Sequence, residues 1–171
     1  MQLAHDFNNL RRFSADTDGG PGGSFSGMSP VLQGLHPDLD DMLKQFERLT
    51  RISRPSGKEG EVCEYLASVA QQNGWEHKID ATGNIVIYVP GAGMGADAEP
   101  VALQAHMDMV CVPTDMQEIV LKRGRRSIER DGKSEERDIV TATETTLGAD
   151  NGIGIAAMLA LLRARGIAAL L

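Results

Sequence analysis

Apolar residues recur at helical spacing in three segments of the chain. The first segment follows Pro37, a residue that suits the first turn of a helix, and ends before Arg54. The second spans residues 58–73 and has Gly74 at its C-terminal end. The third follows Asn151 and is the run GIGIAAMLALLRARG, which is apolar on most of its surface. We therefore expect three helices, the last of them largely buried.

Alternating and short apolar runs predict the strands. Residues 75–80 and 84–89 are expected to pair across a short turn, and residues 101–108 to form a third strand. The polar stretch that follows predicts a hairpin excursion around residues 119–122, and a short strand resumes at residues 139–140. Two helices, four strands and a final helix are typical of a layered α/β domain with a mixed sheet.

The first 35 residues differ from the rest of the chain in composition. They contain six glycines and few apolar residues, with DGGPGGSFSG at their centre. Such a segment buries too little apolar surface to offset the entropy lost on ordering. We expect a disordered extension over residues 1–35 and a folded domain over residues 36–171.

Two ionisable residues stand at the end of the run VALQAHMDMV, which is otherwise mostly apolar. Successive side chains of a strand point to opposite faces, so His106 and Asp108 are expected on the same face. A carboxylate in that place can hold an imidazole, or a metal ion bound to the imidazole. The alternative is a strand end that carries two ordinary surface residues.

Asp150 lies in TTLGADNGIG, where a loop meets the apolar third helix. An aspartate at this position is also a favoured helix N-cap. Gly148, Gly152 and Gly154 crowd around it, which indicates close backbone approach beyond what a cap requires. The same glycines fit the GxGxxA form of a dinucleotide site, but no buried strand leads into them. A second acidic candidate, Glu135–Glu136, lies in a run of charges that predicts a solvated loop between short strands.

Composition narrows the classes of partner. The chain has 17 basic and 24 acidic residues, for a net charge of −7, which argues against binding to nucleic acid or to an anionic membrane. Its two cysteines show no metal-binding or disulfide spacing, which fits a reducing, cytoplasmic setting. No apolar run is long enough for a transmembrane helix. Arg11 and Arg12 suggest an organelle-targeting peptide, but the acidic residues nearby count against one.

Taken together, LQAHMDMV and TTLGADNGIG resemble motifs of the metal-dependent exopeptidases of the aminoacylase and carboxypeptidase G clan, in particular the aminoacyl-histidine (Xaa-His) dipeptidase group. The likeness extends over about residues 37–165 and includes RPSGKEGEVCEYLA and TGNIVIYVPG. It implies a zinc-exopeptidase catalytic domain that hydrolyses dipeptides with two divalent ions, zinc or alternatively cobalt or manganese. By this resemblance His106 is a metal ligand, and Asp108 is the catalytic-site carboxylate that orients His106. Asp150 is the carboxylate that bridges the two ions, and the resemblance also implies a cis peptide bond between Asp150 and Asn151.

The resemblance also shows what this sequence does not contain. The family's paired glutamates, which supply the general base and a further ligand, follow the bridging aspartate by another strand and helix, and its dimerisation domain comes later. We therefore expect the N-terminal part of a catalytic domain, inactive by itself, from a parent protein that forms a homodimer. Two alternatives are an acyl-amino-acid deacylase of the same clan and a non-catalytic fragment that serves as an interaction module.

Overall fold

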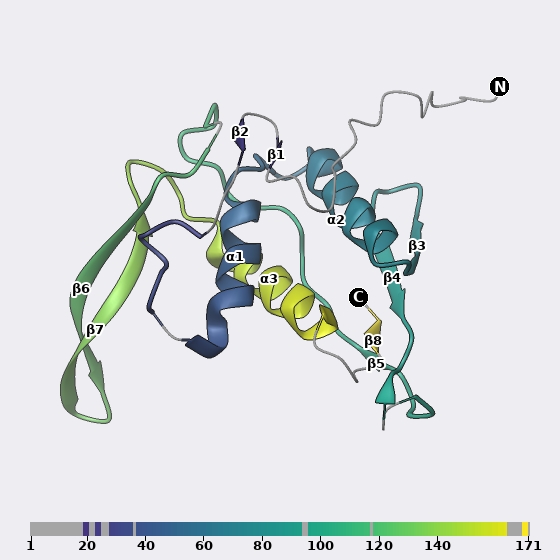
Figure 1. Cartoon of the computed structure of the whole chain (residues 1–171). Helices are drawn as coiled ribbons and strands as arrows, with labels where there is room; N and C mark the ends of the chain where they lie inside the picture. Colours follow the sequence, from purple (N-terminus) through teal and green to yellow (C-terminus); the bar gives the residue numbers. More distant parts are fainter. Residues whose placement is uncertain are drawn as a thin grey trace.

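The computed structural model describes residues 19–20, 23–24, 28–35, 37–93, 96–116, 118–163 and 169–170. Helices and strands together form a mixed α/β structure (Figure 1). In chain order the elements are β1 (Gly19–Gly20), β2 (Gly23–Ser24), η2 (Pro37–Leu39), α1 (Asp40–Leu49), α2 (Gly60–Gln72), β3 (Glu76–Ile79), β4 (Ile85–Val89), β5 (Val101–Ala102), β6 (Leu121–Arg130), β7 (Lys133–Ala142), α3 (Ala149–Arg163) and β8 (Ala169–Leu170).

The three predicted helices are confirmed, and their apolar faces meet in one core. Helix α1 lies beside α3, and both contribute to a cluster that also includes α2 and β4 (Figure 1). Leu159 of α3 and Ile87 of β4 are almost fully buried in it. One side of α3 stays open, however, since Leu161 is 46% exposed.

The predicted pair of strands before residue 90 is confirmed as β3 and β4, which run antiparallel. The turn between them is held by Asp80, whose Oδ1 accepts hydrogen bonds from the backbone N–H groups of Thr82 and Asn84 at 2.8 and 3.0 Å. The sheet order is β3-β4-β8-β5, with β8 antiparallel to β4 and parallel to β5. The sheet is mixed as predicted, although β8 was not foreseen.

The third predicted strand is much shorter than expected. Only Val101 and Ala102 form β5, and the chain from residue 103 to 108 is not paired in a ladder. A strand needs a hydrogen-bonded neighbour, and among the described residues β8 offers only two residues to β5. Further along, Met109 forms a single parallel bridge with Pro55. The segment with His106 and Asp108 is therefore held by its contacts with the loop after α1 and by Leu103, Ala105 and Met107, which pack against the core, and not by a strand ladder.

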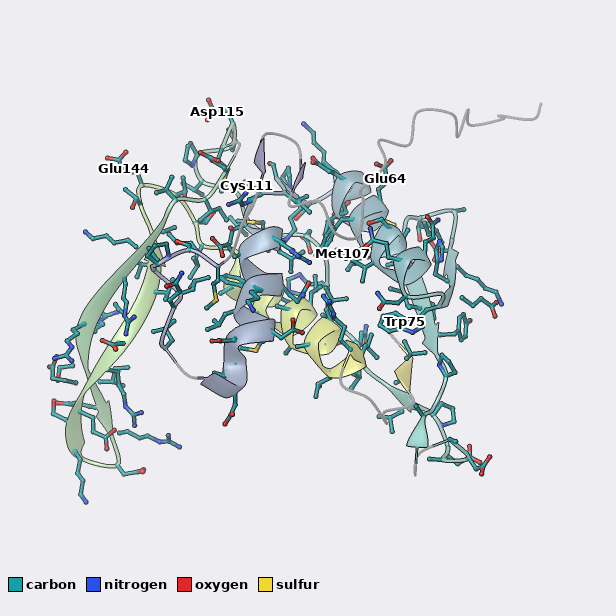
Figure 2. The ribbon with its side chains drawn as sticks, in the orientation of Figure 1. Glu64, Trp75, Met107, Cys111, Asp115 and Glu144 are labelled. Carbon is teal, nitrogen blue, oxygen red and sulfur yellow. The ribbon has the colours of Figure 1, made fainter. Side chains whose placement is uncertain are left out.

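The hairpin predicted around residues 119–122 is confirmed, but it is longer than expected and includes the strand predicted at residues 139–140. Strands β6 and β7 pair over ten residues each, from Leu121↔Ala142 to Arg130↔Lys133. Asp131 and Gly132 form the turn with φ of 52° and 73°, as a two-residue type I′ connection requires. Glu135 and Glu136 are exposed as expected, but they belong to strand β7 rather than to a loop. Side chains of this hairpin project into solvent (Figure 2).

The predicted extension over residues 1–35 falls mostly outside the described residues. Residues 28–35 are an exception, because Met28 and Leu32 are buried against Leu43 of α1. The backbone N–H of Ser29 also donates to Glu47 Oε2 at 3.0 Å. Ordered structure therefore begins before His36, since two apolar side chains in this stretch find room on α1. Within the described part of the chain, no helix has the length and apolar character needed to cross a membrane.

Candidate metal centre

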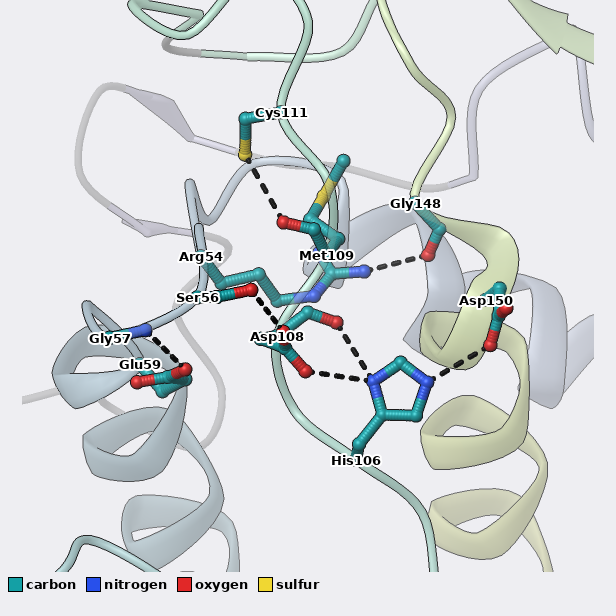
Figure 3. A network of polar contacts seen from close by, with 10 residues as sticks. All are labelled: Arg54, Ser56, Gly57, Glu59, His106, Asp108, Met109, Cys111, Gly148 and Asp150. Atoms are coloured by element: carbon teal, nitrogen blue, oxygen red, sulfur yellow. Dashed lines mark hydrogen bonds and ion pairs between the residues drawn. The ribbon is translucent and has the colours of Figure 1, made fainter.

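The two predicted site motifs come together although 44 residues separate them. His106 lies on the unpaired segment after β5, and Asp150 lies in the first turn of α3. The His106 Nε2 atom is 3.0 Å from Asp150 Oδ1 (Figure 3). The two side chains are 50% and 94% exposed, so the atoms that face each other remain open to solvent and to a ligand.

Asp108 holds the opposite side of the imidazole, as predicted. Its Oδ1 lies 2.9 Å and its backbone oxygen 3.1 Å from His106 Nδ1 (Figure 3). The hydroxyl of Ser56 donates to the other carboxylate oxygen of Asp108. A proton on Nδ1 is donated to Asp108, and in the absence of a metal ion a proton on Nε2 is donated to Asp150. Loss of the Nε2 proton frees the lone pair that a metal ion would use. Our residue-by-residue prediction did not include Ser56, although it is part of the RPSG motif that carried the resemblance.

The carboxylate of Asp150 contacts His106, which the N-cap alternative does not account for. The Asp150 backbone, with φ −92° and ψ 106°, is not helical, and this conformation is compatible with an N-cap as well as with a ligand position. The peptide bond between Asp150 and Asn151 is cis, as the resemblance implied. Gly154 leaves room for the Asn151 side chain, which a Cβ at that position would overlap.

The geometry accommodates part of a metal site. Zinc binds histidine nitrogen and carboxylate oxygen at about 2.0–2.2 Å, so two donors 3.0 Å apart can both reach one ion. Among the described residues, however, no group of three or more His, Cys, Asp or Glu side chains can hold a metal ion. Cys111 does not add a ligand, because it is buried and its thiol contacts the Met109 carbonyl oxygen at 3.7 Å. The described residues therefore supply two ligands, and a complete site needs more.

Both carboxylates change the acid–base behaviour of the imidazole. Hydrogen bonds raise the pKa of His106 above its usual value, and the bond to Asp150 contributes more than the bond to Asp108. Ser56 and His106 lower the pKa of Asp108, because both donate to its ionised form. In the absence of a metal ion, these hydrogen bonds favour the protonated imidazole over the neutral one. Because a metal ion needs the neutral imidazole nitrogen, protons and metal compete for Nε2.

We expect the pKa of the His106 ring in metal-free protein to lie above the ordinary histidine value. Because its pKa is raised, its pairing with the carboxylates stabilises the fold below the unfolded-state pKa and loses this effect as pH rises through the folded-state pKa. Asp150→Asn should shift the midpoint downward, and Asp97→Asn should not, because Asp97 is an exposed residue of a distant turn. NMR of the ring protons against pH measures both. An unchanged midpoint in Asp150→Asn would contradict the assigned contact.

The chain is similar to peptidases of known function. It is 38% identical over 119 residues to the cytosol non-specific dipeptidase of Escherichia coli, a match that covers 68% of this chain and 23% of that protein. It also matches the crystal structure of aminoacylhistidine dipeptidase from Vibrio alginolyticus with a TM-score of 0.61 and 31% identity, over 85% of this chain and 28% of the other. The chain is homologous to part of these dipeptidases. The predicted resemblance is confirmed.

Two other solved structures share the fold of this dipeptidase homologue. Aminopeptidase PepT from Bacillus cereus matches with a TM-score of 0.54 and 22% identity, over 76% of this chain and 35% of the other. A tripeptidase from Staphylococcus aureus has the same score and identity, over 80% and 36%. No protein-family model matches the chain. Because the chain spans only about a quarter of the E. coli dipeptidase, homology alone does not assign that protein's activity to it.

Proposed function

We propose that this chain forms part of the active site of a metal-dependent dipeptidase that cleaves Xaa-His peptides. In this proposal His106 and Asp150 are metal ligands, and Asp108 is the carboxylate that positions His106. The observation that carries it is the 3.0 Å approach of His106 Nε2 to Asp150 Oδ1, with Asp108 at 2.9 Å behind the ring. All three side chains are partly or largely exposed, so burial does not force them together. A shared metal ion would explain why they are aligned.

The chain's own residues prepare the site for a divalent ion. Asp108 accepts a hydrogen bond from Nδ1–H and so selects the tautomer in which Nε2 can bind a metal. Ser56 fixes the second oxygen of Asp108 and prevents that carboxylate from rotating away from the ring. Asp150 offers a nearly fully exposed carboxylate that could hold a divalent ion. Such an ion, when bound, would polarise a peptide carbonyl and lower the pKa of a bound water.

Several finer features of the proposal are supported by the relatives. The E. coli relative is a cytosol dipeptidase, which agrees with a cytoplasmic hydrolase, and the V. alginolyticus relative is an aminoacylhistidine dipeptidase, which agrees with His-containing dipeptides as substrates. The layered zinc-exopeptidase domain, the pair of zinc ions and a homodimeric parent protein also belong to this proposal. The imidazole and carboxylate donors suit zinc, cobalt and manganese.

A metal titration tests the ligand assignment directly. With two ligands from the described residues, the 171-residue chain should bind a single Co²⁺ or Zn²⁺ ion weakly at pH 7.5. His106→Ala and Asp150→Asn should abolish this binding, and Asp108→Asn should weaken it by about 10–100-fold. Calorimetry measures affinity and stoichiometry, and the visible spectrum of Co²⁺ reports its coordination. Asp97→Asn, at an exposed and distant carboxylate, is the matched control.

Either of two results would end the metal proposal. One is a wild-type chain that binds no more Co²⁺ than His106→Ala does. The other is binding that survives both His106→Ala and Asp150→Asn, which would place the ion at other residues. Two tight sites in this chain would contradict the smaller claim that the described ligands are too few.

A further inference from the structure

We propose that Arg54 is a positioning residue that sets the place of Asp150 relative to His106. It lies in the loop between α1 and α2, away from the atoms that face a ligand. Figure 3 shows its side chain above Asp108 and His106 in this view, with the guanidinium extending toward Gly148 at the start of α3. In this role Arg54 touches no metal or substrate and acts through the backbone on both sides of the site.

The Arg54 side chain is held on the Asp150 side of the site. Arg54 is only 1% exposed, and its Nη2 donates to the Gly148 carbonyl oxygen at 2.7 Å. Its Nη1 donates to the Leu49 carbonyl oxygen at the end of α1, at 2.9 Å. The same Gly148 oxygen accepts the Gly152 N–H at 3.1 Å. The guanidinium thus fixes the start of α3 against the end of α1, two residues before Asp150.

The glycines around Asp150 provide the space for this contact. A Cβ at Gly152 would lie 2.5 Å from Arg54 Nη2, and one at Gly148 would lie 2.9 Å from the same nitrogen. Gly148 also has a φ of +66°, a conformation that residues with a Cβ rarely adopt. The sequence indicated an unusual backbone at three glycines, and the guanidinium passes close to two of them, Gly148 and Gly152. Arg54, which is 94 positions from Gly148, is the nearest neighbour of a Cβ at Gly152, whereas at Gly148 Met109 Sδ is nearer still, at 2.5 Å.

The backbone beside Arg54 holds the other half of the site. The Met109 N–H donates to the Arg54 carbonyl oxygen at 2.9 Å, and Met109 forms a bridge with Pro55. Ser56, two residues after Arg54, donates to Asp108. One short segment therefore contacts both motifs, with the Arg54 side chain on the Asp150 motif and its backbone on the His106 motif. A change at the guanidinium shifts one half of the site relative to the other.

A contribution to stability alone is a poor explanation for this residue. No carboxylate of the described residues forms an ion pair with Arg54, and its Nε has no hydrogen-bond partner among them. Burying a charge against carbonyl oxygens carries a desolvation cost that an apolar side chain of similar size avoids. The guanidinium offers what such a side chain cannot, namely two directed donors that reach separate backbone segments.

The test compares Arg54→Met, Arg54→Lys and the control Lys58→Met, an exposed cation in the same loop. NMR of metal-free protein follows the ring nitrogens of His106 and the backbone amides of residues 148–152. Arg54→Met should displace these signals while the remaining core spectrum stays native, Arg54→Lys should restore them in part, and Lys58→Met should leave them unchanged. Gly152→Ala should reproduce the Arg54→Met shifts, because its Cβ drives Nη2 from its place.

Leu66→Ala separates positioning from loss of stability, because Leu66 is a buried core residue of α2. It should lower the unfolding midpoint without moving the His106 and Asp150 signals of the folded protein. If Arg54→Met does not fold, Arg54→Lys and Gly152→Ala decide. The proposal is overturned if the folded variants at position 54 or 152 leave the His106 and 148–152 signals unchanged, or if Leu66→Ala moves them equally.

A second readout rests on the proposed metal site. Arg54→Met should weaken Co²⁺ binding by about 10–100-fold, the range typical of residues that orient a metal ligand. A wild-type chain that binds no Co²⁺ would contradict the proposed function and leave the metal-free NMR test intact. If Co²⁺ binds with equal affinity to wild type and Arg54→Met, the positioning role is wrong even though the metal site is right.

Discussion

A polypeptide of these 171 residues should hydrolyse no His-containing dipeptide at a detectable rate, even with zinc or cobalt in excess. Hydrolysis of an amide requires a group that takes a proton from the attacking water, and such a group contributes about 10²–10⁴-fold to the rate. Of the carboxylates described at the site, Asp108 comes nearest to serving as this general base. Its two oxygens, however, already accept hydrogen bonds from Ser56 and His106. With His106 and Asp150 as the described ligands, an ion is also held too weakly to act as a strong Lewis acid.

Chromatographic detection of released histidine measures this expected absence of turnover. Asp150→Asn is the matched control, since both proteins should give the same background rate. Turnover in the wild type that Asp150→Asn abolishes would show that the described residues suffice for catalysis. An N-acetylated amino acid as a second substrate addresses the deacylase alternative. Selective cleavage of this substrate would favour a deacylase over a dipeptidase.

The sequence predicted best those elements whose periodicity arises from burial on one face. The three helices appear close to their expected limits, because α1, α2 and α3 each bury a stripe of apolar residues in a common core. The spacing of His106 and Asp108 was equally informative. Side chains two residues apart on an extended chain reach the same side whether or not a ladder forms. The contact between His106 and Asp108 was therefore predicted correctly, although the long strand was not.

The hairpin β6–β7 was underestimated because its residues are exposed on both faces. Without a buried face there is little alternation of apolar and polar residues, and the charges suggest a loop. The sequence does contain one signal that the prediction overlooked, the pair Asp131–Gly132, which favours a two-residue hairpin turn. Strand β8 carried no comparable signal, since a strand of two residues leaves almost no pattern.

The role of Arg54 lay beyond sequence reasoning for a different reason. Glycines around Asp150 indicated that something approaches the backbone, but not which residue. That residue is 94 positions from Gly148, and an arginine in a loop is normally exposed. Only the fold reveals that the end of α1, the segment of His106 and the start of α3 meet at this side chain.

Replacing Leu159 with alanine should lower the free energy of unfolding by about 2–5 kcal/mol, the range for removing a buried leucine. Leu159 is fully buried in the core that α3 shares with α1, α2 and β4. The loss combines the transfer free energy of the removed methyl groups with the cavity that a close-packed core does not fill. Because a domain of this size has a total stability of about 5–15 kcal/mol, this single change is a large fraction of it.

Leu161 provides the matched control for this prediction, because it lies on the same helix and is 46% exposed. Leu161→Ala should change the unfolding free energy by no more than about 0.5 kcal/mol, as is usual for exposed positions. Urea denaturation followed by circular dichroism gives both values. Equal effects of the two variants would mean that α3 is not packed by the face assigned here. Since Asp150 lies in the first turn of this helix, that result would also remove the structural basis for its approach to His106.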